Sequence, residues 1–425
     1  MTLRSTLIIA LVVAASSTSF AQIEVHPDLQ FYRPNDMTGL NVFETSKEDT
    51  IPFDGLKVRV GGDFALQFQG VSQSNKFGSD SALKLVDLGS NVNLPTANLN
   101  LDVQLADGMR MHLRTYLSSR HHAEAWVKGG HLQIDKLDFI KKGFLENIMN
   151  VTTIRVGLDE FNYGDAHFRR SDNARAIFNP FVGNYIMDSF STEAFGEVNI
   201  QSKGLIVVAG ITNGKLNQDV RVSETTDNKM SIYGKLGYDK QLNEDLRLRI
   251  TGSIYTNQGT STGTWLYGGD RAGGRYYYVL HTDSSGGSDF EGRVNARFTQ
   301  LTAFQINPFV KWKGLEFFGI FEVASGSEEN TDGYTQIAAE IIYRFGGKDQ
   351  LYVAGRYNTV DGKYSSQGKD QMVTRFNLGG GWFMTNNVLV KAEFVNQMYD
   401  GEGFEGSKYN EAEFSGVVVE AVIGF

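Results

Sequence analysis

Cysteine is absent from this chain of 425 residues, proline occurs only 6 times, and no apolar run has the length of a membrane-spanning helix. A helix needs about 20 apolar residues to cross a bilayer. The lack of cysteine excludes a scaffold stapled by disulfides. The formal net charge of −9 argues against a nucleic-acid-binding protein. Hydrogen-bonded strands are left to hold the fold, in a chain that is rich in glycine, with 47 residues.

The N-terminus has the pattern of an export signal. Arg4 precedes the apolar run 7–15, and residues 19–21 (Ser-Phe-Ala) offer a small-x-small cleavage site. We therefore predict a signal peptide over residues 1–21, removed before Gln22. A membrane-anchoring helix is the alternative, but the apolar run is too short for it.

From Lys57 onward, apolar and polar residues alternate with a period of two, which in a strand places them on opposite faces. Val58, Val60 and Phe64, for example, alternate with charged or small residues. The pattern predicts an all-β protein, and recurs in sixteen segments: 57–70, 94–106, 109–120, 123–136, 152–160, 191–201, 204–212, 228–240, 245–258, 291–312, 314–325, 334–345, 349–360, 371–384, 387–400 and 411–425.

The connections between these segments alternate in length. Tight turns are expected at 107–108, 202–203, 243–244, 313–314, 346–348 and 385–386, and longer loops at 71–93, 161–190, 213–227, 259–290, 326–333, 361–370 and 401–410. Short turns on one side and long loops on the other are typical of a transmembrane β-barrel of the Gram-negative outer membrane. In lipid such a sheet has to close, and sixteen strands leave an aqueous lumen. Counts of fourteen or eighteen strands remain open.

A soluble β-sandwich or β-propeller is the alternative fold, since sandwich strands also alternate. Neither soluble fold explains well the length of the chain or the fact that the long loops all lie at one end of the predicted strands. Residues 22–56 do not alternate, and we expect them to lie in the periplasm or to enter the lumen as a plug.

The last strand carries Ala421, Ile423 and the terminal Phe425 on one face. It resembles the assembly signal that outer-membrane proteins present to the barrel-assembly machinery. Residues 57–425 as a whole resemble the sixteen-stranded general or substrate-selective porins, with phosphate-selective porins as a plausible relative. The resemblance implies a bilayer with lipopolysaccharide as surroundings, a homotrimer, and a third extracellular loop folded into the barrel, here 161–190.

If the apolar faces meet lipid, fifteen basic and nine acidic residues face the lumen. The basic ones are Lys57, Arg59, Arg110, Arg114, Lys128, Arg155, Lys235, Arg247, Arg249, Arg293, Arg297, Arg344, Arg356, Arg375 and Lys391, and the acidic ones Asp63, Asp102, Glu124, Glu193, Glu197, Asp239, Glu340, Glu393 and Glu420. A narrow pore focuses such an imbalance onto permeating ions. We therefore expect passive diffusion of small hydrophilic solutes with a mild preference for anions.

We expect the pore constriction to involve the basic residues Arg169, Arg170 and Arg175 of the infolded loop, facing Arg110 and Arg114 on the wall. Guanidinium groups suit phosphate and carboxylate because they donate two parallel hydrogen bonds. Asp165 and Asp172 of the same loop complete the seven residues that we assign to the constriction. The alternative is that these arginines are neutralised by nearby carboxylates, for which the loop supplies the same two aspartates.

The sequence gives no support for catalysis, for a cofactor or for a metal site. The adjacent His121 and His122 would point to opposite faces of a strand, so a shared ion is disfavoured. Three rival functions remain: a non-conducting receptor, adhesin or scaffold; a carbohydrate-selective channel using the tyrosines of 259–290; and a hydrolase with a catalytic Ser or carboxylate near His112 or His167.

Overall fold

The computed structural model describes residues 26–79, 81–118, 126–216, 220–222, 227–259, 266–269, 274–283, 290–296, 298, 300–326, 333–363 and 368–425. The predicted signal peptide and the pair His121–His122 lie outside these residues. Within the described part of the chain, no helix is long and apolar enough to cross a membrane.

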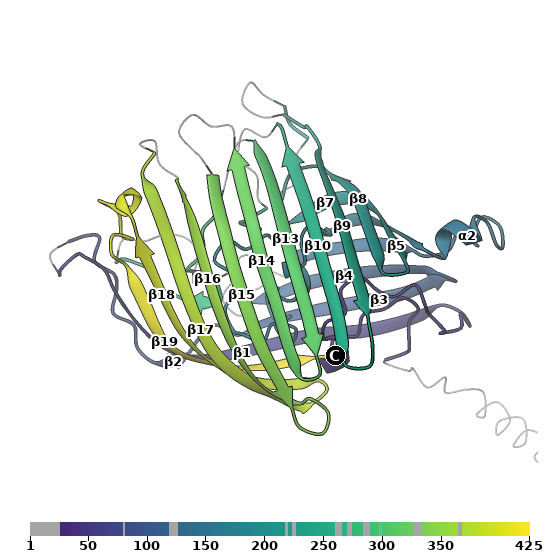
Figure 1. The fold of residues 1–425 in the computed structure, drawn as a ribbon, viewed down its shortest axis with the longest axis horizontal. Coiled ribbons are helices and arrows are strands. Elements are labelled where there is room, and N and C mark those ends of the chain that lie inside the picture. Colours follow the sequence, from purple (N-terminus) through teal and green to yellow (C-terminus); the bar gives the residue numbers. More distant parts are fainter. Residues whose placement is uncertain are drawn as a thin grey trace, which may run out of the picture.

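Sixteen long antiparallel strands form one closed sheet in the described residues. The strands are β1 (Lys57–Ser74), β3 (Thr96–Ala106), β4 (Met109–Ser118), β5 (Trp126–Ile134), β6 (Thr152–Glu160), β7 (Thr192–Ser202), β8 (Leu205–Thr212), β9 (Ser231–Gln241), β10 (Leu246–Asn257), β13 (Leu301–Trp312), β14 (Leu315–Gly326), β15 (Gly333–Phe345), β16 (Leu351–Lys363), β17 (Asp370–Thr385), β18 (Val388–Asp400) and β19 (Glu413–Gly424). Each pairs with the next, and β1 pairs with both β3 and β19, which closes the barrel (Figure 1).

Each of the sixteen predicted segments overlaps one of these strands, so the predicted strand count is confirmed. The segment 291–312 was predicted too long, because its strand begins only at Leu301. Residues 290–291 instead form β12 (Phe290–Glu291), which pairs with β11 (Tyr276–Tyr277) away from the main sheet. Gly292 has φ +90°, a left-handed conformation that ends the extended run. Arg293 is therefore not a strand residue, and Arg297 and Glu124 lie outside the described residues.

The remaining elements are short. They are β2 (Asn91–Val92) beside β1, the 3-10 helices η1 (Met37–Gly39), η2 (Ala166–Phe168) and η3 (Glu402–Phe404), and the α-helix α2 (Glu146–Met149). Helix α2 lies between β5 and β6, outside the ring of strands (Figure 1).

The two faces of each strand differ as the alternation predicts. On β10, Ile250 and Ile254 are 55% and 51% exposed on the outer face, whereas Arg249 and Tyr255 on the inner face are 3% and 0% exposed. A bilayer accepts the apolar outer face only if every strand edge is paired, and the closed ring meets that condition. Ala421, Ile423 and Phe425, proposed as the assembly signal, also lie on the exposed face of β19.

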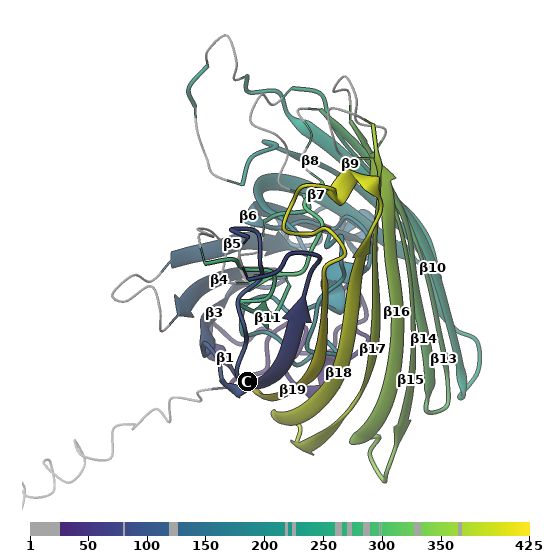
Figure 2. The ribbon, with the colours of Figure 1, turned by 90° about the vertical axis from the view of Figure 1, so that its left-hand side faces the viewer.

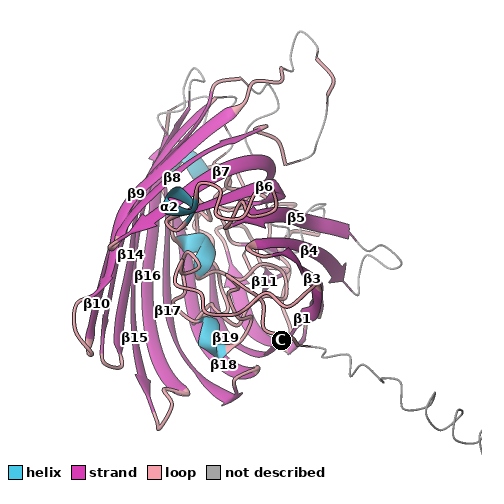
Figure 3. Ribbon diagram, turned by 90° about the vertical axis from the view of Figure 1, so that its right-hand side faces the viewer, coloured by secondary structure: helices cyan, strands magenta, loops and turns pink. Residues whose placement is uncertain are grey.

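Segments from three parts of the chain lie inside the barrel. They are the described residues of 26–56, 161–191 and 266–300, drawn as loops and short helices within the ring of strands (Figures 2 and 3). His26 contacts Phe425 edge-to-face at 5.7 Å, so the start of the described chain and the C-terminus lie together. These inner segments decide how much of the lumen is open.

Candidate functional site

One half of the barrel lumen is filled. Fourteen inward polar side chains on β13–β19 are at most 1% exposed, although they would meet water in an open pore. They are Gln305, Asn307, Glu316, Glu322, Gln336, Glu340, Arg356, Asn358, Arg375, Asn377, Lys391, Glu393, Gln397 and Glu420. Their burial requires polar partners from the segments inside the barrel.

The segment 161–191 supplies many of these partners. The hydroxyl of Tyr163 donates to Glu322 at 3.1 Å, and that of Tyr185 donates to Glu340 at 2.7 Å. The ammonium of Lys391 donates to three main-chain carbonyls, of Ala176, Asn179 and Phe181, at 2.8–2.9 Å. Side-chain donors and main-chain carbonyl acceptors of the segment together fasten it to the wall.

The segment 266–300 covers the rest of this half. The hydroxyl of Tyr276 donates to Glu393 at 2.5 Å, and that of Tyr267 donates to Glu322 at 2.9 Å. Both tyrosines are fully buried, at 0% exposure. Neither lines the cavity described next, so the two do not present the stacking surface that a sugar would need.

A cavity with about 930 Å³ of empty space, part of it continuous with solvent, lies against the opposite wall, β3–β7. Its lining comes from that wall, from the segment 161–191 and from the N-terminal segment 26–56. The lining residues are Tyr32, Arg33, Asn35, Phe43, Glu44, Thr45, Asn100, Asp102, Arg110, His112, Arg114, His131, Gln133, Thr153, Arg155, Asp159, Glu160, Asn162, His167, Phe168, Arg175, Phe178, Glu197 and Asn199. We call this cavity the passage.

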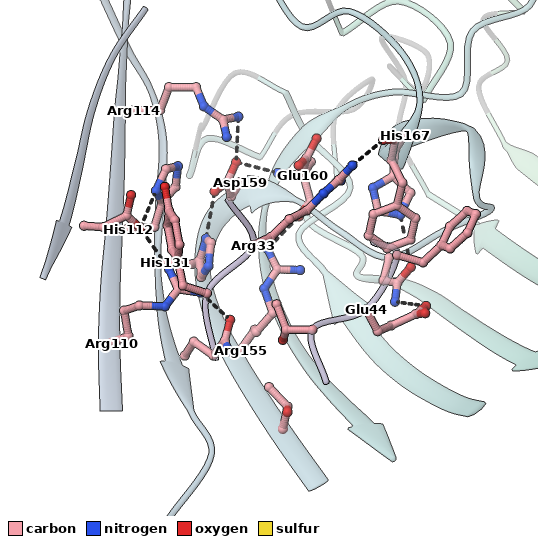
Figure 4. A pocket seen from close by; sticks show the side chains of 18 of the residues that line it. Arg33, Glu44, Arg110, His112, Arg114, His131, Arg155, Asp159, Glu160 and His167 are labelled. Atoms are coloured by element: carbon pink, nitrogen blue, oxygen red, sulfur yellow. Dashed lines mark hydrogen bonds and ion pairs between the residues drawn. The ribbon is translucent and has the colours of Figure 1, made fainter. Parts of the chain in front are cut away.

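The N-terminal segment forms one side of the passage, although the sequence did not place it. Lys47 pairs with Asp135 at 2.7 Å, and Glu44 pairs with Arg249 at 2.7 Å. Figure 4 shows Arg33 between the wall that carries His112 and His131 and the side that carries Glu44. One feature of the sequence could have indicated that this segment lines a cavity: aromatic and charged residues are adjacent in it, as in Tyr32-Arg33 and Phe43-Glu44.

Most arginines of the passage are neutralised by carboxylates. Arg110 pairs with Asp102 at 2.8 Å, Arg155 with Glu197 at 3.0 Å, and Arg175 with Glu160 at 3.1 Å. These pairs agree with the alternative expectation from the sequence, in which nearby carboxylates neutralise the arginines of the lumen. They leave little net charge along the wall.

Arg33 differs from these arginines. It donates to two main-chain carbonyls, of Gly39 at 3.1 Å and Phe168 at 3.0 Å, and no described carboxylate forms an ion pair with it. Its guanidinium lies over the ring of Phe178, 3.9 Å from the centroid. Burial and the neighbouring Arg175 lower the pKa of Arg33 to about 9, so it remains charged at neutral pH. Among the described residues that line the passage, Arg33 is therefore the arginine without a carboxylate partner.

Three of the seven residues predicted for a constriction line the passage: Arg110, Arg114 and Arg175. Arg114 also pairs with Asp172 of the inner segment at 3.0 Å, and so brings wall and loop together as expected. Whether these residues set selectivity remains a prediction.

The other predicted residues lie behind the passage. Arg170 pairs with Asp188 at 2.6 Å, and Asp165 lies between Lys235 and Arg249, each at 2.8 Å. Arg169 lies 3.5 Å from Glu340 and contacts Asn41. Asp165 and Arg169 thus attach the segment to the wall, whereas the pair of Arg170 with Asp188 lies within the segment, and none of these side chains lines the cavity.

His167 makes the packing of the inner segment sensitive to acid. Its Nε2 lies 3.0 Å from Asn162 Oδ1, and burial, assisted by Lys235, lowers its pKa to about 3. Between about pH 6.5 and 3 the unfolded histidine binds a proton that the folded one excludes, so stability falls by up to about 1.4 kcal/mol per pH unit as the pH falls. We expect H167Q to flatten this part of the pH–stability curve. Denaturant titrations at pH 7 and pH 4 measure the difference, and equal slopes in both proteins would count against the assignment.

No family model and no curated relative matches the chain. Solved structures do. The anion-selective porin of Comamonas acidovorans aligns with 87% of this chain and 100% of its own, at 11% identity and a TM-score of 0.51. The outer-membrane channel DcaP of Acinetobacter baumannii aligns with 88% of this chain and 99% of its own, at 9% identity and a TM-score of 0.51. OprB of Pseudomonas putida aligns with 87% and 94%, at 10% identity and a TM-score of 0.50. At this identity the likeness concerns the fold: the chain forms a closed sixteen-stranded antiparallel barrel, the fold that these outer-membrane proteins share.

Proposed function

We propose that the protein is a non-enzymatic outer-membrane porin that lets small hydrophilic solutes diffuse through the passage, with a mild preference for anions. The observation that carries the proposal is the polar cavity between β3–β7 and the inner segments, inside a wall whose outer face is apolar. Charged side chains line it, and the half-filled lumen restricts it to small molecules.

The anion preference rests on Arg33. Fixed charge in a narrow, low-dielectric pore acts strongly on a permeating ion. Since the other arginines that line the passage form ion pairs with described carboxylates, Arg33 contributes a positive charge that no described ion pair offsets. A porin of Comamonas acidovorans with the same fold is described as anion-selective, which agrees with this proposal at the level of the fold.

We expect R33Q to reduce the anion preference. The measurement is the reversal potential in a KCl gradient across planar bilayers, which should move toward zero in the variant. The matched control is K141Q, which removes the same charge from an exposed residue that does not line the passage. A parent channel that prefers cations, or equal shifts in both variants, would contradict the proposal.

A non-conducting barrel that acts as a receptor, adhesin or scaffold is the second candidate. The filled half of the lumen, with its wholly buried polar wall, favours it. Single-channel recording separates the two, because a scaffold gives no current steps. A homotrimer, contacts with lipopolysaccharide and recognition by the barrel-assembly machinery remain expectations. Cross-linking in detergent would test the trimer.

A further inference from the structure

Four side chains form a row across neighbouring strands on the passage wall. Asp102 lies on β3, His112 on β4, His131 on β5 and Asp159 on β6, and these strands are consecutive in the sheet. His112 is the direct cross-strand partner of both Asp102 and His131. The two imidazoles are therefore central, and a carboxylate flanks each on its outer side.

The carboxylates fix the orientation of the rings. His112 Nδ1 lies 3.0 Å from Asp102 Oδ1, and His131 Nδ1 lies 2.8 Å from Asp159 Oδ2. An ionised carboxylate only accepts hydrogen bonds, so each neutral imidazole carries its proton on Nδ1. The remaining nitrogen, Nε2, then has a free lone pair on the edge of the ring that faces away from the carboxylate.

The two rings are close enough to share one ion. Their centroids are 5.4 Å apart, with the ring planes inclined by 42°. Two imidazoles bound to one ion at about 2.0–2.1 Å have centroids roughly 5 Å apart. Nε2 of His112 is buried without a hydrogen-bond partner, in a residue only 8% exposed, and both histidines line the passage.

A glycine provides room for this arrangement. Gly157 on β6 is paired with His131, and a Cβ at Gly157 would lie 2.7 Å from the Cβ of His131. Any side chain at Gly157 would therefore displace His131 and separate it from Asp159.

We propose that His112 and His131 form a two-imidazole site for a divalent transition-metal ion such as Cu²⁺ or Zn²⁺. Imidazole suits these ions, and a carboxylate on the second ring nitrogen makes it a better ligand. Water from the passage completes the coordination. Arg110 and Arg155, each within an ion pair beside the row, limit the affinity. The site would therefore bind an ion weakly and exchange it readily, unlike a closed structural site.

The test uses the tag-free full-length protein folded in detergent, with His121 and His122 replaced by alanine to remove a competing adjacent pair. Cu²⁺ is titrated and followed by electron paramagnetic resonance. We expect one bound ion whose spectrum shows coupling to two imidazole nitrogens. H112Q and H131Q should lose this signature, while H167Q, which removes a histidine elsewhere in the passage, should retain it.

A second experiment tests Asp159, which does not bind the ion itself but orients the ring of His131. D159N keeps both imidazoles and removes the charge behind one of them, so Cu²⁺ affinity should fall about 10–100-fold. In planar bilayers, Zn²⁺ should reduce the current of the parent at concentrations where Mg²⁺ has no effect, and H131Q should abolish this difference.

The proposed metal site and the proposed porin function can be refuted independently of each other. If H112Q and H131Q bind Cu²⁺ with the same spectrum and affinity as the parent, the metal site is wrong, whatever the conductance. If the protein gives no current but shows the two-nitrogen signature, the metal site stands and the porin function is wrong.

Discussion

Replacing Asp165 with alanine is expected to lower the free energy of unfolding by about 3–5 kcal/mol. The carboxylate accepts hydrogen bonds from Lys235 and Arg249, each at 2.8 Å, and from Thr251 at 2.7 Å. The side chains of all three charged residues are 0% exposed. Without Asp165, two cations remain buried with Glu44 as their closest acidic partner.

The charge state of Asp165 supports this expectation. Burial alone would raise the pKa of this carboxyl, but Arg249 and Lys235 hold it well below its usual range. Asp165 is therefore ionised at neutral pH. Because it joins the inner segment to β9 and β10, its removal should also loosen the segment and raise the single-channel conductance.

Denaturant titration in detergent, followed by tryptophan fluorescence, measures the stability change. The matched control is D245A. Asp245 pairs with Lys313 at 3.7 Å, and these side chains are 54% and 63% exposed. An exposed pair of this kind contributes at most about 1 kcal/mol. Similar losses in D165A and D245A would show that the buried cluster does not hold the inner segment.

Replacing Lys391 with methionine is the second substitution with a large expected effect. The ammonium donates to the carbonyls of Ala176, Asn179 and Phe181 and pairs with Glu420 at 2.9 Å. Methionine has a similar length but no donor, so three buried carbonyls lose this partner and Glu420 loses one of its two cations, the other being Arg275. Breaking one buried pair costs about 3–5 kcal/mol, and unpaired carbonyls add to this.

We expect K391M to open the filled half of the lumen. Single-channel conductance should rise, and the segment 161–191 should become accessible to protease while the barrel remains closed. The control is K76M, since Lys76 pairs with Glu411 at 2.8 Å with side chains 56% and 66% exposed. Unchanged conductance in K391M, together with full protection from protease, would show that the segment is held by other contacts.

The strands could be predicted because a half-lipid, half-lumen environment imposes a period of two on each of them separately. On β10, for example, Ile250 and Arg249 had to face opposite sides whatever the other strands did. The prediction failed at 291–300, where alternating residues belong to a segment inside the barrel. Periodicity cannot distinguish a membrane strand from an irregular segment inside the barrel whose residues happen to alternate.

The passage could be predicted only in part. Arg110, Arg114 and Arg175 were identified because their strands or the expected loop placed them inward. Arg33 and Glu44 were missed because a segment without periodicity gives no information on where it lies. Arg169, Arg170 and Asp165 were expected at the constriction, but Arg169 and Asp165 pair with charged residues of the wall, and Arg170 pairs with Asp188 of its own segment.

The sequence by itself determined a closed, two-faced barrel, with sixteen as the expected number of strands, because hydrophobic alternation and loop length are local properties of each hairpin. The tertiary structure alone decided which part of the lumen stays open, which arginine lacks a carboxylate, and that His112 and His131 lie side by side. These properties depend on strand register and on contacts between residues far apart in the chain, such as Lys391 with the carbonyl of Ala176. Such contacts follow from the free energy of the whole assembled barrel, which no local pattern encodes.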